Sequence, residues 1–471
     1  MRELRAYKKT VSIVNETPIG LYESYVGNEK GFLLESYDKN NGRYTFFGKN
    51  PENIITSNGN QLLIQGRDGT TEVREGNPLE ELKNYYSEFH VTKDEGELAF
   101  IGGFVGSLAY DFIRYSEDIP DENEDEIGIE TIQFMYAKEF IVIDHVAETL
   151  TGVVLEEDTE AGRMVGMNQA HQLVQEVLQA YQEHPPVQTA FVHDGVIVKK
   201  SDTIEEYSEK VEKIKQYIKE GHIFQTVLSQ RWTIETKQKG FDLYKELRVL
   251  NPSPYLYYFN FDDFEIIGSS PEMLVKKIDK KVFTCPIAGT RPRGKTKEED
   301  VALKVDLLSD EKEKAEHVML VDLARNDMGR ISEFGTVKVT QFMQVQNYSH
   351  VMHIVSLVEG KKKGESHSMD LVASFLPAGT LSGAPKIRAM EIIDELETVR
   401  RGLYGGATGY LSFDGNMDFC ITIRTMIKKG ENVYLQAGAG IVLDSVPENE
   451  YQECCNKVMA LAKTLVEEEN L

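Results

Sequence analysis

The order of strand-like and helix-like segments constrains the fold of this chain more than any other feature. In the first part of the chain, strand-like runs dominate. Residues 32–36 and 44–47 flank the turn-rich segment 38–42, and its final Asn-Gly is a hairpin signal. Residues 140–144 have the apolar run of a buried strand. This part of the chain is therefore predicted to be rich in β-structure.

Helices and strands mix in the second part of the chain. Apolar side chains from Ile204 to Ile218 recur at spacings of three and four, which predicts a helix that ends at Gly221. Residues 224–232 follow as a strand, whose alternation places on one face Gln225, Val227, Ser229 and Arg231. A last helix begins near Glu448. This order favours an α+β fold over regular βαβ units.

The length of the chain predicts two domains. A chain of 471 residues is too long for one simple core. The candidate linker is His184-Pro185-Pro186-Val187, which follows a helix-like stretch around residues 173–181. We therefore predict an N-terminal domain over residues 1–190 and a C-terminal domain over residues 191–471.

Composition excludes several classes of function. The formal net charge of −25 repels nucleic acid and anionic membranes, and the acidic run 121–126 is most simply a solvated loop. There is no apolar stretch of about eighteen residues and no apolar signal core after the basic start, so we expect a cytoplasmic protein. We expect reduced thiols at the four cysteines, Cys285, Cys420, Cys454 and Cys455. An anionic small molecule would need a local cluster of cations or a metal ion to bind in this negative field.

Two pairs of glutamates lie on predicted helices. Glu313 and Glu316 follow Ser309, which can cap the first helix, and Glu450 and Glu453 lie on the second. Residues three apart share a helix face, so the members of each pair repel each other. A hard cation such as Mg²⁺ between the two helices would offset this repulsion, because carboxylate oxygens are its ligands. The alternative is that acidic first turns merely complement the helix dipoles.

Three segments of small residues are candidate ligand loops. They cover residues 286–290, 378–386 and 437–440. Glycine lets backbone N–H groups approach carboxylate or phosphate oxygens closely. The segments match no phosphate-loop or dinucleotide fingerprint, and each alone is also typical of a tight turn.

Taken together and in order, short strings resemble the chorismate-utilising enzyme family. Those in the second part of the chain are residues 224–231, 270–272, 286–290, 315–327, 351–353, 379–386, 404–406, 421–424 and 437–440. The N-terminal part is more loosely similar to the anthranilate synthase component I branch of this family, at residues 33–36, 102–106 and Tyr110-Asp111. The resemblance implies large antiparallel β-sheets packed with helices, in two intertwined subdomains.

Two positions sort the reactions of this family. Members that add water carry a lysine base where this chain has Gln225, and a glutamine cannot activate water. Aminodeoxychorismate synthases carry a nucleophilic lysine where this chain has Ala288. The resemblance therefore implies direct attack of ammonia on chorismate, which gives anthranilate and pyruvate. Two alternatives are aminodeoxychorismate synthase component I and a non-catalytic tryptophan-binding regulator of the same fold.

The resemblance also implies roles for individual residues. Mg²⁺ would bind the ring carboxylate of chorismate and be held directly by Glu316 and Glu453, with Glu313 and Glu450 acting through water. Glu272 would be the general acid for the departing hydroxyl group, and His353 would move protons. The other implied catalytic residues are Gln225 and Thr380, and the implied substrate contacts are Ala288, Gly289, Thr290, Tyr404, Arg424, Gly438, Gly440 and Lys457. Competing interpretations are a solvated acid at Glu272, a structural histidine at His353 and a surface ion pair at Arg424.

The resemblance further implies a partner and a regulator. The sequence has no Gly-x-Cys-x-Gly glutaminase turn, so ammonia must come from solution or from a separate glutamine amidotransferase subunit, component II. The implied tryptophan site for feedback inhibition consists of Ser36, Pro252, Ser253, Pro254 and Tyr255. An ordinary strand end and a proline turn are the alternative there.

Overall fold

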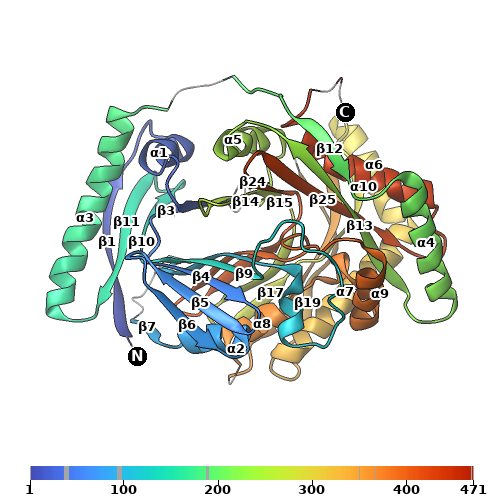
Figure 1. The fold of residues 1–471 in the computed structure, drawn as a ribbon, viewed down its shortest axis with the longest axis horizontal. Helices are drawn as coiled ribbons and strands as arrows, with labels where there is room; N and C mark the ends of the chain where they lie inside the picture. Colours follow the sequence, from blue (N-terminus) through green and yellow to red (C-terminus); the bar gives the residue numbers. More distant parts are fainter. Residues whose placement is uncertain are drawn as a thin grey trace.

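Two large β-sheets form the centre of the molecule (Figure 1). The computed structural model describes residues 2–36, 42–92, 98–186, 190–348, 351–364, 366–467 and 469. Within these ranges the first sheet has 13 strands, in the order β12 (Val196–Lys200), β13 (Gln225–Glu235), β25 (Asn432–Ile441), β24 (Thr425–Lys429), β15 (Glu265–Ser270), β14 (Tyr255–Asn260), β2 (Gly31–Glu35), β3 (Tyr44–Lys49), β10 (Glu139–Asp144), β11 (Thr149–Glu157), β1 (Arg2–Ser12) and β7 (Phe89–Thr92), with β21 (Gly383–Ala384) beside β13.

The second sheet has 12 strands within the same described ranges. Their order is β18 (Ile287–Pro292), β20 (Val351–Lys361), β17 (Lys281–Thr284), β16 (Met273–Ile278), β23 (Met417–Ile421), β22 (Ala407–Ser412), β8 (Gly103–Leu108), β9 (Ile132–Ala137), β4 (Asn53–Asn58), β5 (Gln61–Gly66) and β6 (Thr71–Glu75), with β19 (Lys338–Asn347) beside β20. Early and late strands meet in both sheets, in the antiparallel pairs β14–β2 and β22–β8. The predicted α+β fold with large antiparallel sheets and intertwined halves is confirmed.

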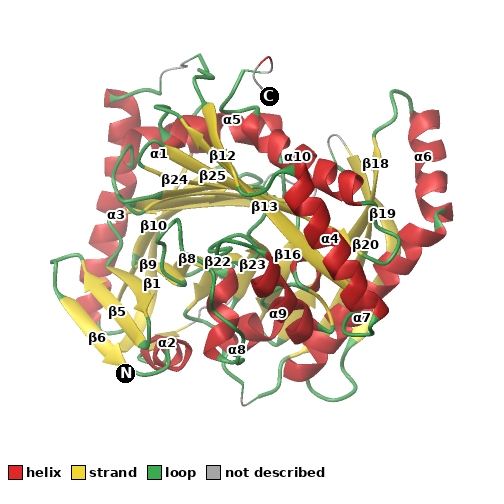
Figure 2. Ribbon diagram, turned by 45° about the vertical axis from the view of Figure 1, so that its right-hand side comes forward, coloured by secondary structure: helices red, strands yellow, loops and turns green. Residues whose placement is uncertain are grey.

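Helices lie around the outside of the sheets (Figure 2). They are α1 (Pro18–Tyr25), α2 (Pro78–Tyr86), α3 (Glu160–Glu183), α4 (Ile204–Lys219), α5 (Gly240–Leu250), α6 (Lys297–Ser309), α7 (Glu311–Ile331), α8 (Ser368–Phe375), α9 (Lys386–Leu396) and α10 (Pro447–Ala462), with the short 3₁₀ helices η1 (Tyr110–Tyr115) and η2 (Gly379–Leu381). The helices α1, α3, α5 and α10 cover the outer face of the first sheet.

The main core lies between the two sheets, and alternation along the strands builds it. On β14, Tyr257 and Phe259 join this inner core, whereas Tyr258 joins the outer cluster under the helices. Rings from the two sheets meet directly, as where Phe46 and Tyr410 lie 6.0 Å apart between centroids. Strands that are buried on both faces explain why so many runs in the sequence are apolar throughout.

Most of the predicted elements are confirmed. Strands β2 and β3 pair antiparallel as the hairpin signal indicated, although residues 37–41 of its turn lie outside the described residues. The strands predicted at 140–144 and 224–232 are β10 and β13, and the helix predicted from Ile204 is α4. Gly221 follows α4 with φ of 81°, a backbone conformation that suits glycine after a helix.

One helix cap was predicted wrongly. Ser309 is the last residue of α6, and its hydroxyl donates to the carbonyl oxygen of Val305. Asp310 caps α7 instead, because its carboxylate accepts from the backbone N–H groups of Lys312 and Glu313. An aspartate is as good an N-cap as a serine, and the sequence did not reveal that a helix already ends at Ser309.

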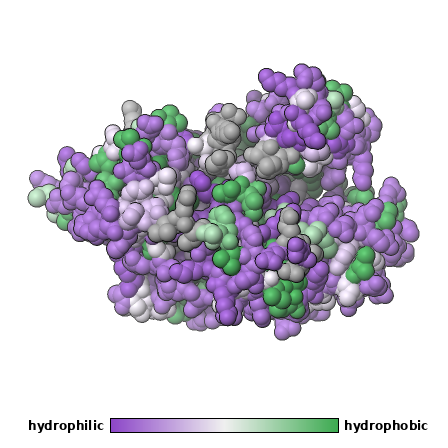
Figure 3. All heavy atoms as spheres, turned by 90° about the horizontal axis from the view of Figure 1, so that it is seen from above, coloured by the Kyte–Doolittle hydropathy of each residue, from purple (hydrophilic) through white to green (hydrophobic). Residues whose placement is uncertain are grey.

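The proposed division near residue 190 stays a prediction. Residues 184–195 connect α3 to β12, but both sheets contain strands from before and after this segment. In the described part of the chain, no helix is both long enough and apolar enough to cross a membrane. The face in Figure 3 is mostly hydrophilic, with separate hydrophobic patches.

Candidate active site

A cavity of about 220 Å³ lies where β13 and β25 meet α7, α10 and the loop around η2. Many predicted site residues line it, namely Gln225, Glu272, Glu316, Thr380, Tyr404, Arg424, Gly438, Gly440, Glu453 and Lys457. Gln225 lies near Gly438 and Gly440 because β13 pairs with β25. In this pairing Val227 is opposite Gly440 and Ser229 is opposite Gly438. The fold therefore gathers residues that are more than 200 positions apart in the sequence into one cavity.

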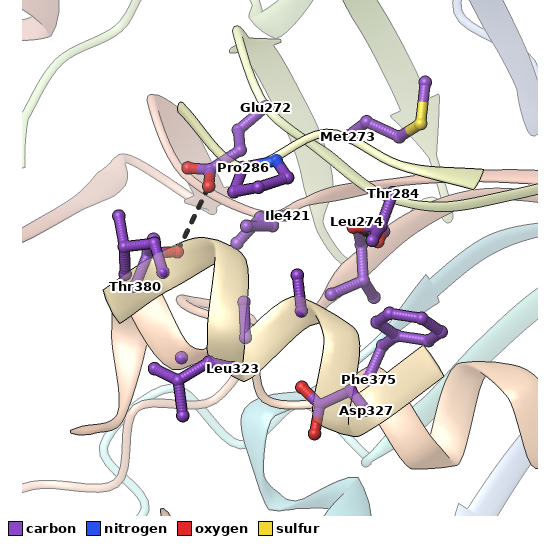
Figure 4. A pocket seen from close by; sticks show the side chains of 14 residues that line it. Glu272, Met273, Leu274, Thr284, Pro286, Leu323, Asp327, Phe375, Thr380 and Ile421 are labelled. Carbon is purple, nitrogen blue, oxygen red and sulfur yellow. Dashed lines mark hydrogen bonds between the residues drawn. The ribbon is translucent and has the colours of Figure 1, made fainter. Parts of the chain in front are cut away.

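Glu272 is a buried carboxyl group that accepts a hydrogen bond from a hydroxyl group. It lies in the connection between β15 and β16, and the Thr380 hydroxyl donates to its Oε1 at 3.3 Å (Figure 4). Burial raises the pKa of Glu272 to about 8, and the Thr380 hydrogen bond and the positive charge of Lys457 oppose this only in part. The carboxyl group is therefore mostly protonated at neutral pH, as a general acid must be.

Arg424 offers an unpaired cation to the cavity. Its guanidinium has no hydrogen-bond or ion-pair partner among the described residues, and burial lowers its pKa. The backbone φ is 52°, an uncommon conformation for a residue other than glycine, and it is held by a bond from the backbone N–H of Ser269 to the Arg424 carbonyl oxygen. A desolvated guanidinium without a partner fits a ligand carboxylate, which it can bind through two parallel hydrogen bonds.

The four glutamates of α7 and α10 form a negatively charged group at one side of the cavity. Burial raises the pKa of Glu316, and the charges of Glu313 and Glu453 raise it further. Burial likewise raises the pKa of Glu450, with a further contribution from Glu453. Lys457 compensates one charge, since its Nζ donates to Glu453 Oε1 at 2.7 Å and to the Gly438 carbonyl oxygen at 2.8 Å.

This donor set fits Mg²⁺. Burial and the nearby carboxylates raise the pKa values of Glu316 and Glu450, while Arg291 lies 3.5 Å from Glu313. Carboxylate oxygens are the ligands that Mg²⁺ prefers. Among the described residues, no three histidine, cysteine, aspartate or glutamate side chains are close enough together to form a complete metal site by themselves. Mg²⁺ commonly takes one or two protein carboxylates and completes its shell with water and substrate, so two carboxylates from α7 and α10 are enough to hold it.

Glycines keep side chains of the site in place. A Cβ atom at Gly438 would lie 2.9 Å from the Tyr404 hydroxyl oxygen, and one at Gly440 would lie 2.9 Å from Gln225 Nε2. Gly289 has a φ of 64°, and a Cβ atom there would lie 3.1 Å from Glu313 Oε2. The close approach of backbone and side chains accounts for glycine at these positions.

His353 and its neighbours lie beside the cavity rather than in its lining. His353 Nδ1 donates to the Gly289 carbonyl oxygen at 2.9 Å, so in the neutral ring Nε2 carries the lone pair. Thr290 pairs with His353 across β18 and β20, and Ile287 from β18 reaches the cavity itself. Burial lowers the pKa of His353, and the charge of Arg424 lowers it further. The predicted residues outside the cavity lining are Ala288, Gly289, Thr290, Glu313, His353 and Glu450.

A buried ion pair under the cavity was missed by sequence reasoning. Arg401 donates to Glu397 at 2.6 and 2.8 Å and to the carbonyl oxygens of Leu381 and Val227. Its guanidinium also lies 5.6 Å from the ring centre of Tyr404. It therefore ties β13, the η2 loop and the Tyr404 segment together. The two residues lie four apart in the segment after α9, and opposite charges at this short separation were the available signal.

A second cavity, of about 560 Å³, lies between the N-terminal and C-terminal strands. Of the predicted tryptophan-site residues, Ser36, Pro254 and Tyr255 line it, whereas Pro252 and Ser253 do not. Pro271 and Ile287 line both this cavity and the first one. Glu272 lines the first cavity, its neighbour Met273 lines the second, and Pro271 lines both.

Residues 31–463 match the family of chorismate binding enzymes. The chain is 48% identical to anthranilate synthase component 1 of Acetivibrio thermocellus, over 96% of this chain and 93% of that protein. It is 42% identical to anthranilate synthase component 1 of Bacillus subtilis (strain 168), over 97% and 91% of the two chains.

Solved structures agree with these sequence matches. The crystal structure of anthranilate synthase component I from Streptococcus pneumoniae TIGR4 superposes with a TM-score of 0.78 at 38% identity, covering 96% of this chain and 94% of that one. The menaquinone-specific isochorismate synthase of Escherichia coli shares the fold, with a TM-score of 0.73 at 18% identity and coverage of 98% and 95%.

Proposed function

The chain belongs to the family of chorismate-binding enzymes, in its anthranilate synthase component I group, and we propose that it converts chorismate and ammonia to anthranilate and pyruvate. The observation that carries the proposal is the pairing of a proton donor with an unpaired cation in one cavity. Glu272 is protonated near neutral pH, and Arg424 has no partner among the described residues. These groups suit a dianionic substrate that must lose a hydroxyl group.

Charge neutralisation would hold the substrate. Glu316 and Glu453, with Glu313 and Glu450 beside them, would hold Mg²⁺, which when bound supplies positive charge for the ring carboxylate of chorismate. Arg424 binds the enolpyruvyl carboxylate through its guanidinium, and the Tyr404 hydroxyl group lies on the same cavity wall. The backbone at Gly438 and Gly440 supports the ring carboxylate from the β25 side.

The two chemical steps need proton transfers at defined atoms. As ammonia attacks C2 of chorismate, Glu272 gives its proton to the C4 hydroxyl group, which leaves as water. In the second step a base removes the C2 proton while the bond from C3 to the ether oxygen breaks, and the enolpyruvate that leaves takes up a proton to become pyruvate. His353 suits this step because Nδ1 is engaged by Gly289 and Nε2 has the free lone pair. Gln225 lines the cavity but cannot activate water, which favours ammonia as the nucleophile.

Ammonia would be supplied by a partner. We propose a glutamine amidotransferase subunit, component II, as the source, with free ammonia as the substitute in its absence. A cytoplasmic location belongs to the same proposal, and the buried thiols of Cys420 and Cys454 suit a reducing compartment.

Tryptophan would act from the second cavity. Ser36 comes from the N-terminal strands and Tyr255 from the C-terminal ones, so a ligand in contact with both favours one relative position of the two. Pro271 and Ile287 line both cavities, so a ligand in the second cavity can affect Glu272 through these two residues. We propose that tryptophan in this cavity inhibits the enzyme.

A product assay tests the proposed reaction. The purified chain with chorismate, Mg²⁺ and ammonium salt at raised pH should form fluorescent anthranilate, and Glu272→Gln should not. Turnover with glutamine should appear only after a component II subunit is added. Aminodeoxychorismate as the product would support the folate-pathway alternative, and no product would support a regulator. Glutamine-dependent turnover by the chain alone would contradict the proposed partner.

A further inference from the structure

One face of α7 carries four residues that lead from the metal-binding glutamates to the far end of the η2 loop. Glu316, Leu320, Leu323 and Asp327 follow at spacings of four, three and four, so they lie in one stripe along the helix. Glu316 and Leu320 line the catalytic cavity. The last two residues of the stripe contact the loop over residues 379–386 instead.

The stripe holds this loop at both ends. At its start, a Cβ atom on Gly379 would lie 2.8 Å from Leu323 Cδ1, so the backbone packs directly on that side chain. At its end, Lys386 Nζ lies 3.1 Å from Asp327 Oδ2, and these side chains are only 15% and 7% exposed. Between the two anchors, Thr380 donates to Glu272.

A small cavity lies on the α7 side of the loop. Its volume is about 40 Å³, and Glu272, Thr380 and Asp327 all line it. Figure 4 shows Glu272 and Asp327 on different sides of this cavity, with Thr380 beside Glu272. Where a cavity replaces packed atoms, a side chain loses contacts that would fix its orientation. On its other side the loop is held by the pairing of β21 with β13 and by the bond from Arg401 to the Leu381 carbonyl oxygen, so the two anchors on α7 set the position of Thr380 relative to that helix.

We propose that Asp327 and Lys386 are positioning residues for the proton donor, because their ion pair fixes to α7 the loop that lets Thr380 orient Glu272. This inference rests on the proposed function of Glu272 as the general acid. Asp327 and Lys386 end two strings of the sequence, residues 323–327 and 379–386. The proposal gives these two side chains a role although neither binds substrate or metal. The groups that face Glu272 are Thr380, Lys457 on α10 and the Cys285 thiol after β17.

The test compares two buried ion pairs of similar exposure. Asp327→Asn and Lys386→Met should lower kcat about 10- to 100-fold, because a misplaced acid no longer reaches the leaving hydroxyl group. The alkaline limb of the kcat–pH profile should move to higher pH, since the Thr380 bond lowers the pKa of Glu272. The matched controls are Asp202→Asn and Lys210→Met, whose ion pair is 5% and 15% exposed and lies outside the cavity lining. They should lose similar thermal stability without changing kcat or the pH limb.

A double-mutant cycle separates positioning from a general structural role. Thr380→Val should reproduce the shift of the pH limb. Adding Asp327→Asn to it should lower kcat little further, because both changes remove the same orientation of Glu272 by Thr380. Lys386→Arg should restore most of kcat, and it also serves as the test if Lys386→Met does not fold. Additive effects, an unmoved pH limb or equal loss of kcat in the control pair would overturn the inference. Full activity of Glu272→Gln would instead overturn the proposed function.

Discussion

The two main cavities differ in how their charges are compensated. In the catalytic cavity the Arg424 guanidinium has no partner among the described residues, and the glutamates of α7 and α10 repel one another. In the second cavity the charges are paired, as where Lys276 lies 2.7 Å from Asp418, which also accepts from the Tyr255 hydroxyl group at 2.9 Å. Unpaired charge marks the site that must bind an anionic substrate, and paired charge marks a site that can stay stable whether or not a ligand is present.

The cavities also differ in which parts of the chain build them. Among the described residues, those that line the catalytic cavity all lie between Gln225 and Leu461. The second cavity is lined by strands from the later part of the chain and also by Leu34, Glu35, Ser36, Arg43, Tyr44 and Phe46. Changes in the first cavity should therefore alter turnover itself. Changes in the second cavity should alter how a ligand bound there affects the catalytic cavity, and should leave turnover without that ligand unchanged.

Removing a metal-binding carboxylate should have the largest effect. Glu316→Gln removes one ligand and one charge from the proposed Mg²⁺ site, and we expect turnover to fall by about 10³-fold or more, equivalent to several kcal/mol. Mg²⁺ binding by calorimetry should weaken in parallel. The control is Glu448→Gln, an exposed glutamate in the first turn of α10 that is outside the cavity lining. Undiminished wild-type activity in EDTA would contradict the metal assignment.

Replacing the proton donor should separate activity from stability. Glu272→Gln should lower kcat by about 10²- to 10⁴-fold, the usual contribution of a general acid. The pKa of Glu272 is about 8 in the folded protein and 4.5 ordinarily, so its contribution to stability is complete below pH 4.5 and is lost as pH rises through 8. The variant should therefore be increasingly more heat-resistant than wild type from pH 5 to pH 9. A difference in Tm that does not change with pH would show that Glu272 is not a buried acid.

Removing the unpaired cation should weaken substrate binding. Arg424→Gln loses two charge-assisted hydrogen bonds to the substrate carboxylate, and we expect KM for chorismate to rise by about 10- to 100-fold. Arg43→Gln is the comparison in the second cavity, where the guanidinium already pairs with Asp144 at 2.7 Å. That variant should leave KM unchanged. Equal effects of the two substitutions would remove the distinction between unpaired and paired charge.

The sequence pointed to groups of residues that are joined by short spacings, and it gave no signal for contacts between distant residues. The glutamate pairs of α7 and α10 were found from their spacing of three, and the predicted residues Arg424 and Gly438 line the cavity as expected. The Asp327–Lys386 pair joins residues 59 positions apart, and no periodicity in the sequence indicates that contact. Arg401 had a local signal in Glu397, but its contacts with β13 and the η2 loop appear only in three dimensions.

The strands show the same limit. Apolar runs predicted β10 and β13 correctly because buried strands consist mostly of apolar residues. The order of strands in the two sheets could not be predicted, because early and late strands pair through backbone groups that every residue has. The shared wall at Pro271 and Ile287 follows from that order and was therefore missed.

The smallest effect on turnover is expected in the second cavity. Ser36 lines it next to Leu34 and Glu35, and Tyr255 lines it from β14. A tryptophan that contacts both sides would bind one arrangement of the two halves better than another, which is sufficient for allosteric inhibition. Because coupling is reciprocal, chorismate should weaken tryptophan binding by the same factor by which tryptophan weakens chorismate binding.

Ser36→Phe should fill this cavity, relieve inhibition and leave uninhibited kcat and KM nearly unchanged. The measurement is a titration of anthranilate formation with tryptophan, together with calorimetric binding of tryptophan to wild type and variant. Ser36→Ala removes the hydroxyl group without filling the cavity, so it should retain inhibition and distinguish occlusion from loss of a single contact. The tryptophan site would be contradicted if millimolar tryptophan does not inhibit the wild type, or if it inhibits Ser36→Phe equally. The paired charges of the second cavity would then serve stability alone.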